Sequence, residues 1–318
     1  MLKSSGPPTA KKELAWAVPF LHRSGILNAR LEAEVLLAHA LGWTRAKLLG
    51  HLPETIGEAE QRRFREMVKK RAEHYPLQYL TGCREFMSLD FAVNEHVLIP
   101  RDDTEILVQA VLGLKRRVPL AAKIVDVGTG SGIIAICLKK FWPEAQVFAV
   151  DISEKALKVA KRNAEKHSVE ITFVHGDLLQ PFLPQRTACT TNNQQPTTNN
   201  YNNSQQLTTN NYHEAGGFDI VVSNPPYIPA GNVPHLQPEV TFEPVTALAG
   251  GEDGLAFYRR LARESKNVLD RGGWLALEIG SDQGADVKKI LASQGFSEIE
   301  ILDDYANLER VIIGRLLS

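Results

Sequence analysis

The strongest constraint on the fold is the regular alternation of strand-like and helix-like segments from about residue 101 onward. When a helix joins two neighbouring strands of one sheet, the strands run parallel and the helix crosses over a face of the sheet. We therefore expect an α/β fold with a mostly parallel sheet that helices cover on both faces. The seven expected strands are residues 123–127, 146–150, 171–174, 220–223, 274–279, 299–302 and 310–314.

The N-terminal part of the chain follows a different pattern. Between residues 11 and 74 the apolar residues keep helical spacing and no segment resembles a strand, which predicts a small helical bundle. Apolar and polar residues then alternate over 85–93, as expected for a β-hairpin. We therefore divide the chain into an N-terminal helical domain (1–75), a linker with a hairpin (76–100) and an α/β domain (101–318).

One segment of the α/β domain does not fit this plan. Residues 185–217 are rich in Asn, Gln and Thr and contain a tandem repeat whose two copies begin at Gln194 and Gln205. So few apolar residues cannot offset the entropy that is lost when a chain becomes ordered. We predict a low-complexity, disordered surface insertion, whose role the pattern leaves open.

Charge and cysteine content narrow the class of protein. The 318 residues carry a formal net charge of -1, so the chain has no overall attraction to nucleic acid or to an anionic membrane, although a local basic patch remains possible. The cysteines Cys83, Cys137 and Cys189 lack the spacing of a disulfide framework or a zinc site. No apolar stretch is long enough to span a bilayer, so we expect a soluble cytoplasmic protein.

A glycine-rich segment follows the first expected strand. Its residues are Gly128, Thr129, Gly130, Ser131 and Gly132. Alternating glycines let the chain turn tightly and let a ligand approach the backbone closely. Asp151 follows the next strand, at roughly the distance along a βαβ unit where an acidic residue reaches ribose hydroxyls. This arrangement predicts a nucleoside cofactor site, although a glycine-rich turn alone is also a common structural feature.

Details of the loop distinguish two cofactor classes. Dinucleotide sites have the pattern Gly-x-Gly-x-x-Gly, whereas here the third glycine is Gly132 and Ile133 follows, which favours S-adenosylmethionine. After the third strand, the Asp177 carboxylate could accept from the adenine amine and Leu178 could pack on the ring. A simple Gly-Asp turn is the alternative interpretation of this position.

The fourth expected strand ends in Asn224, Pro225, Pro226 and Tyr227. Two prolines cannot continue a central strand, so the chain leaves the sheet here along a nearly fixed path. The Asn224 side-chain oxygen and the Pro225 carbonyl can accept both hydrogens of a planar NH2 group, while the Tyr227 ring offers a stacking face. The motif therefore predicts a catalytic clamp for an amide or an exocyclic amine, with a plain strand exit as the alternative.

Together these motifs resemble a class I methyltransferase that acts on a planar NH2 nitrogen, and further segments resemble the HemK/PrmC family of peptide chain release factor glutamine methyltransferases. The matching segments are residues 76–82, 85–86, 99–105, 243–244, 247–248 and 251–255. The resemblance covers nearly the whole chain except the Asn-, Gln- and Thr-rich insertion. The chain departs from the family at Asp102 and Asp103, where Pro-Glu is usual.

The resemblance implies a Rossmann-like methyltransferase domain and an N-terminal domain that recognises the substrate. It also implies methyl transfer from S-adenosylmethionine to the glutamine side-chain amide in the Gly-Gly-Gln motif of class I release factors, without a metal. Asn224 would then contact both the cofactor and the substrate. Thr104 and Glu105 would support the cofactor pocket, or else cap the helix that begins there.

Three other functions remain open at this point. A ribosomal-protein glutamine methyltransferase uses the same chemistry, and an adenine-amine nucleic-acid methyltransferase would fit the same clamp. The near-neutral charge argues against a direct nucleic-acid substrate. A non-catalytic protein that docks on the translation machinery would not need the cofactor and clamp motifs.

Overall fold

The computed structural model describes residues 7–184 and 217–317, which form two compact units. The first unit comprises Met1–Ile99 and Gly231–Leu248, and the second comprises Pro100–Ala230 and Ala249–Ser318. The predicted insertion at 185–217 lies outside the described residues, apart from residue 217. In the described part of the chain, no helix has both the length and the apolar character that crossing a bilayer requires.

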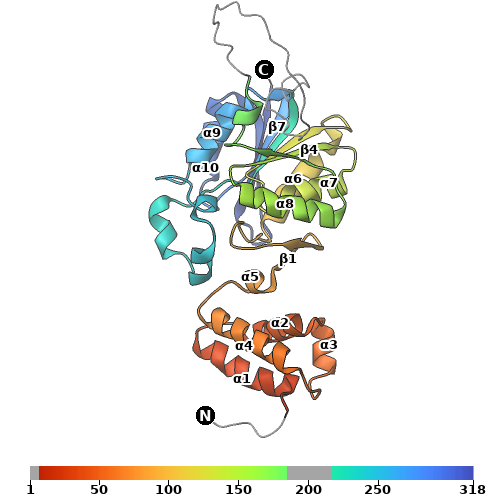
Figure 1. Ribbon diagram of the computed structural model, residues 1–318. Helices are drawn as coiled ribbons and strands as arrows, with labels where there is room; N and C mark the ends of the chain where they lie inside the picture. Colours follow the sequence, from red (N-terminus) through yellow and green to blue (C-terminus); the bar gives the residue numbers. More distant parts are fainter. Residues whose placement is uncertain (1–6, 185–216, 318) are drawn as a thin grey trace, which may run out of the picture. The chain divides into compact units, whose positions relative to one another are not determined.

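Helices form most of the first unit (Figure 1). They are α1 (Ala10–Arg23), α2 (Ala29–Leu41), α3 (Arg45–Gly50), α4 (Glu58–Ala72) and α5 (Leu77–Thr81). Thr9 and Thr44 cap α1 and α3 by accepting from backbone N–H groups of the first turn, which satisfies donors that a helix start leaves free. Leu21, Leu36 and Phe64 are fully buried between α1, α2 and α4, so these helices share one apolar core. This confirms the predicted bundle.

A two-stranded hairpin follows the bundle. Its antiparallel strands are β1 (Cys83–Phe86) and β2 (Leu89–Ala92). Met87 and Ser88 both have positive φ angles, of 48° and 61°, which suits the two-residue turns that match the twist of a hairpin. The hairpin that the alternation at 85–93 predicts is therefore present.

The first unit also includes a segment that lies far away in the sequence. Residues 231–248 contain three short 3-10 helices, Ala230–His235, Pro238–Phe242 and Val245–Ala247. Glu239 accepts from Arg71 at 2.9 Å, and the buried carboxylate of Glu243 accepts from the Ile99 amide at 2.9 Å. Because of such contacts this segment belongs with the N-terminal helices, whereas the sequence-based division places it in 101–318. The roles assigned to the two domains remain predictions.

The second unit is built on a seven-stranded sheet, as predicted. The strands are β3 (Lys123–Val127), β4 (Gln146–Asp151), β5 (Thr172–His175), β6 (Phe218–Ser223), β7 (Leu269–Glu278), β8 (Phe296–Asp303) and β9 (Glu309–Leu316). Their order is β5-β4-β3-β6-β7-β9-β8, and only the pairs that involve β9 are antiparallel. β7 begins before the predicted start at residue 274 because it includes a glycine-containing stretch, Asp270 to Gly273, that looks like a turn in the sequence.

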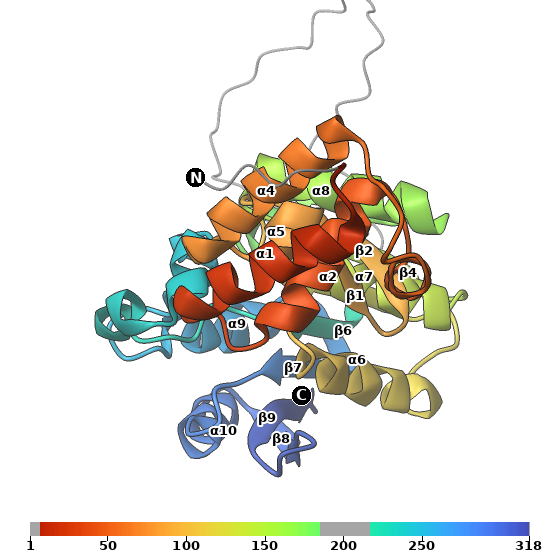
Figure 2. The same cartoon turned by 90° about the horizontal axis from the view of Figure 1, so that it is seen from below.

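Helices cover both faces of this sheet. They are α6 (Thr104–Gly113), α7 (Ile133–Phe141), α8 (Glu154–His167), α9 (Ala256–Ser265) and α10 (Gly284–Ser293). Figures 1 and 2 show α6, α7 and α8 on one side of the sheet, and α9 and α10 on the other. Central strand β3 is accordingly buried at four consecutive positions, on both of its faces. A sheet enclosed in this way leaves the ends of its strands as the natural place for a site.

Candidate active site

The predicted site residues follow the carboxyl ends of neighbouring parallel strands. Val127 at the end of β3 pairs with Val150 in β4 and with Ser223 in β6, while Asp151 pairs with His175 in β5. Since the carboxyl ends of parallel strands meet at one edge of a sheet, the segments that follow these strands lie along the same edge. The structure thus brings the glycine-rich loop, Asp151, the Asp177 loop and the Asn-Pro-Pro-Tyr loop to one edge.

The glycine-rich loop requires its glycines. Gly128 and Gly130 have positive φ angles of 72° and 55°, a backbone conformation that other residues adopt with difficulty. A Cβ atom at Gly128 would meet no atom within 4 Å, and one at Gly130 would meet only the Gly128 carbonyl, at 4.0 Å. The loop therefore leaves open space beside its backbone, as a cradle for a ligand must.

Hydrogen bonds to buried side chains hold the glycine-rich loop in place. Asp126 is fully buried at the end of β3, and its Oδ2 atom accepts from the Thr129 hydroxyl at 2.6 Å and from the Ala135 amide at 3.2 Å. Burial raises the pKa of Asp126 to about 7. Thr129 and Ser131 are themselves buried, and Asn163 donates to the Ser131 carbonyl at 2.8 Å. Thr129 and Ser131, both predicted to bind cofactor, therefore offer backbone rather than exposed side chains to a ligand.

Asp151 connects the glycine-rich loop to β4. Its Oδ2 atom accepts from the Gly130 amide at 2.8 Å, and its Oδ1 atom accepts from the Ser153 amide at 2.8 Å. Burial raises the pKa of Asp151, and these two hydrogen bonds lower it. Each carboxylate oxygen can accept a second hydrogen bond, so ribose hydroxyls remain possible partners. The next residue, Ile152, is 64% exposed, and an apolar side chain so placed could cover an adenine ring. Ile152 is not among the residues that the sequence predicts for the site, because exposure is not visible in a local motif.

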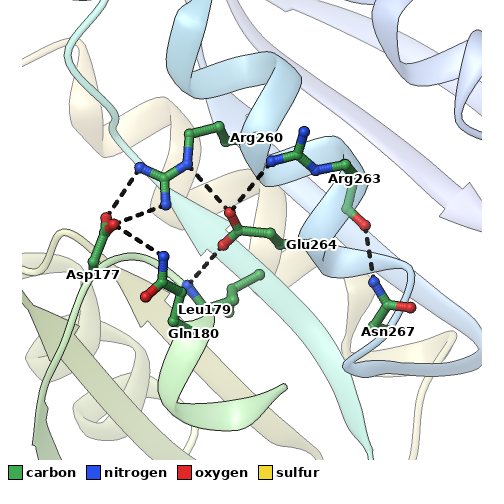
Figure 3. A network of polar contacts seen from close by, with 7 residues as sticks. All are labelled: Asp177, Leu179, Gln180, Arg260, Arg263, Glu264 and Asn267. Atoms are coloured by element: carbon green, nitrogen blue, oxygen red, sulfur yellow. Dashed lines mark hydrogen bonds and ion pairs between the residues drawn. The ribbon is translucent and has the colours of Figure 1, made fainter. Parts of the chain in front are cut away.

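The loop after β5 is tied to helix α9 by a network of charged groups (Figure 3). Arg260 donates to both oxygens of Asp177, at 3.1 and 2.9 Å, and its Nε atom donates to Glu264 at 3.2 Å. The other oxygen of Glu264 accepts from the Leu179 amide at 3.3 Å. Leu178, which lies between Asp177 and Leu179 in this loop, has a positive φ angle of 50°. Asp177 thus has a structural partner that sequence analysis did not foresee, and its predicted contact with adenine stays a prediction.

Asn224 lies immediately after β6 and its side chain contacts α6. Its Nδ2 atom donates to the hydroxyl oxygen of Thr104, the first residue of α6, at 3.1 Å. Glu278, at the end of β7, is buried, and the polar side chains of Thr104 and Asn224 lower the pKa of its carboxyl group. Thr104 and Glu278 are each only 1% exposed, and burial raises the pKa of Glu278 to about 7. No local motif marks Glu278, so sequence analysis missed it.

The backbone after Asn224 packs against a second glycine-rich segment, residues 250–254. A Cβ atom at Gly250 would lie 2.7 Å from the Tyr227 Cα atom and 2.8 Å from the Pro226 carbonyl oxygen. Gln283 donates to the Tyr227 carbonyl at 3.0 Å. Pro225 is buried, while Asn224, Pro226 and Tyr227 are partly exposed. Burial also raises the pKa of Tyr227 to about 12, so its phenol stays neutral.

Comparisons with known proteins give independent information on this arrangement. Residues 13–82 match the PrmC N-terminal domain family, and residues 102–193 match the methyltransferase small domain family. The chain is 39% identical to a release factor glutamine methyltransferase of Geobacter sulfurreducens, over 97% of each chain. It is 42% identical to a protein of the same name from Moorella thermoacetica, over 96% of this chain and 98% of that one.

A solved structure supports the fold alone. The hMettl16 catalytic domain, solved in complex with MAT2A 3'UTR hairpin 6, superposes with a TM-score of 0.51 and 16% identity over 81% of this chain and 82% of that chain. At this identity the likeness concerns the sheet and its helices, and does not extend to the substrate.

Proposed function

Since this chain belongs to the family of release factor glutamine methyltransferases, we propose that its substrate is the glutamine of the Gly-Gly-Gln motif in class I peptide chain release factors. The protein is an S-adenosylmethionine-dependent protein-glutamine N-methyltransferase. The observation that carries the proposal is the family relationship over nearly the full length, combined with an Asn-Pro-Pro-Tyr loop beside a glycine-rich loop at one sheet edge.

The cofactor would be held by backbone atoms from Gly128 to Gly132 and by Asp151, with Ile152 and Leu178 as candidate contacts for the adenine ring. The open space at Gly128 and Gly130 fits a ligand that approaches the backbone. S-adenosylmethionine supplies an electrophilic methyl group on a positively charged sulfur. The residues of this chain contribute position and orientation, and a metal ion is not required for this chemistry.

The acceptor clamp addresses the low reactivity of an amide nitrogen, whose lone pair is delocalised into the carbonyl. In our proposal the Asn224 Oδ1 atom and the Pro225 carbonyl accept the two amide hydrogens, while Tyr227 covers one face of the amide. Pro225 and Pro226 restrict the backbone so that these acceptors stay in place. Holding the nitrogen in line with the methyl group lowers the barrier mainly through orientation, with a contribution from hydrogen bonds that strengthen in the transition state.

We propose that the N-terminal helices recognise the release factor outside its Gly-Gly-Gln loop, because a single side chain provides too little surface for selective binding of a large protein. One observation supports this assignment. The segment Gly231–Leu248 follows the acceptor motif in the chain and belongs to the same compact unit as these helices. A release factor that binds to this unit would therefore stabilise a segment that directly continues the acceptor loop in the chain.

A labelled-methyl assay tests the proposed function. Purified protein and tritium-labelled S-adenosylmethionine are incubated separately with a class I release factor, with ribosomal proteins, and with RNA and DNA. The matched control is the same release factor with the glutamine of its Gly-Gly-Gln motif replaced by alanine. We expect label on the unmodified release factor alone. Equal labelling of the alanine control, or label on nucleic acid or ribosomal protein only, would overturn the proposal.

A further inference from the structure

Two prolines limit how the acceptor loop, residues 224–227, can be held in place. Pro225 and Pro226 have no N–H group, so neither can donate a backbone hydrogen bond. Before the loop, Ser223 is the last residue of β6 and is paired with both neighbouring strands. The position of the clamp therefore depends on how the chain is held at the other end of the loop, from Tyr227 onward.

The chain that follows Tyr227 is bound to the second glycine-rich segment. The Gly250 amide donates to the Ile228 carbonyl at 2.8 Å, and the Ala230 amide donates to the Gly251 carbonyl at 2.8 Å. Both partners in these bonds lie in loops, outside the seven strands of the sheet. A link from these loops to the end of a strand would therefore fix them further.

The side chain of Gln283 provides such a link. Gln283 is the N-cap residue of α10, and its Nε2 atom donates to the Tyr227 carbonyl at 3.0 Å and to the Gly254 carbonyl at 3.5 Å. Its Oε1 atom accepts from the Gly280 amide at 3.0 Å. Gly280 lies two positions after the end of β7, and the intervening Ile279 is fully buried. One side chain thus connects both loops to the end of an interior strand of the sheet.

The partners of Gln283 decide which end of its amide faces the acceptor loop. A backbone amide can only donate and a backbone carbonyl can only accept, so Gly280 requires Oε1 and Tyr227 requires Nε2. The fully buried Tyr258 supplies a further donor, because its hydroxyl lies 3.2 Å from Oε1 and 3.1 Å from the Glu278 carbonyl. If the Gln283 amide turned over, oxygen would face oxygen and N–H would face N–H, so it has one favourable orientation.

Glycines flank both ends of the Gln283 amide. A Cβ atom at Gly280 would lie 2.8 Å from Oε1 of Gln283. A Cβ atom at Gly254 would lie 2.8 Å from Nε2 and 2.5 Å from the Tyr227 carbonyl oxygen. A larger residue at either position would displace the amide or its partner, so the local sequence leaves the space that this link occupies.

We propose that Gln283 is a positioning residue for methyl transfer: its amide holds the Tyr227 carbonyl and so fixes the acceptor loop against the end of β7. This inference rests on the proposed function, since the loop that it positions is the clamp for the glutamine. Gln283 acts through the backbone of Tyr227 and touches no reacting atom. Without this bond, the Pro225 carbonyl and the Tyr227 ring would shift from the geometry that aligns the substrate nitrogen with the methyl group, and small displacements of this kind slow a reaction strongly.

The decisive variant is Gln283→Glu. It keeps the size of the side chain and an acceptor for Gly280, but it places a carboxylate oxygen, which cannot donate, against the Tyr227 carbonyl. We expect kcat to fall by about tenfold to 100-fold, while KM for release factor and calorimetric affinity for S-adenosylmethionine stay within several-fold of the wild type. The matched control is Gln294→Glu, the same change at a partly exposed glutamine at the other end of α10, which should keep the wild-type kcat.

Two further measurements separate positioning from a merely structural role. The fall in kcat should be the same with a short Gly-Gly-Gln peptide as with intact release factor, because the loop acts on the glutamine amide itself. Denaturant unfolding should show that Gln283→Glu is fully folded under the assay conditions. A loss of kcat confined to intact release factor, or one that only follows a smaller folded fraction, would overturn the inference.

A second variant, Gln283→Met, has a similar length and lacks the N–H donor, so it should lose kcat in the same way. If Gln283→Glu does not fold, Gln283→Met alone decides the question. Wild-type kcat in either folded variant would overturn the inference while leaving glutamine methylation intact. If the wild type itself labels no release factor, the proposed function fails instead.

Discussion

The glycine-rich loop and the acceptor loop lie along the same sheet edge, but contacts of very different reach along the chain hold them. Asp126 and Asp151 bind the glycine-rich loop across 3 and 21 residues, and Asp126 also accepts from Ala135 of α7, 9 residues away. Asn224 is bound to Thr104 across 120 residues, and Tyr227 to Gln283 across 56. The cofactor side is thus shaped mainly by its own local sequence, while the acceptor side depends on distant elements that must first pack together.

The largest expected effect is on the acceptor side, from Asn224→Ala. Loss of a preorganised acceptor should reduce kcat by about 100-fold to 1,000-fold, because the missing hydrogen bond matters most in the transition state. The measurement is methyl transfer to intact release factor at saturating cofactor. Affinity for S-adenosylmethionine should change by only several-fold in calorimetry. Turnover like that of the wild type would show that the acceptor is held elsewhere.

The second prediction concerns the cofactor side. Asp151→Ala should weaken S-adenosylmethionine binding by about 1.5 to 3 kcal/mol, the range for a hydrogen bond that involves a charged group. Part of this loss comes from Gly130, whose amide loses its carboxylate partner. Asp151→Asn can still accept from Gly130 and should lose less affinity. Calorimetry that gives the wild-type affinity for Asp151→Ala would place the ribose contact on another residue.

The different reach of these contacts explains which features could be predicted from the sequence. The seven strands and the glycine-rich loop follow from local periodicity and from glycine spacing, so they were predictable. The neighbours of Asn224 and the pairing of Asp177 with Arg260 join segments far apart in the chain, and no local pattern contains them. For the same reason the packing of Gly231–Leu248 with the N-terminal helices could not be foreseen.

A third prediction tests the packing behind the acceptor loop. In Gly250→Ala the new methyl group would collide with backbone atoms of Pro226 and Tyr227, so we expect a loss of about 1 to 3 kcal/mol in unfolding free energy. Gly113→Ala is the matched control, because a Cβ there meets no atom within 4 Å and the residue ends helix α6. That variant should be neutral or slightly more stable. Denaturant unfolding of both variants measures the difference, and equal stabilities would refute this packing.

The smallest effect is expected where the cofactor side relies on a distant partner. Arg260→Gln removes the ion pair with Asp177. The side chain of Arg260 is 31% exposed and that of Asp177 is 35% exposed. Exposure of this degree limits the contribution of the pair to about 1 kcal/mol or less, so cofactor affinity should fall by no more than about fivefold. Calorimetry again provides the measurement. A loss as large as that of Asp151→Ala would mean that the Asp177 loop contributes as much to the cofactor site as the local contacts do.

The most direct test of the account is to locate the methyl group on the product. A class I release factor is incubated with S-adenosylmethionine and either wild-type protein or Asn224→Ala, then digested and sequenced by mass spectrometry. We expect one added methyl group on the side-chain amide of the glutamine in Gly-Gly-Gln with the wild type, and almost none with Asn224→Ala. Methylation at another residue, or equal methylation by both proteins, would contradict it.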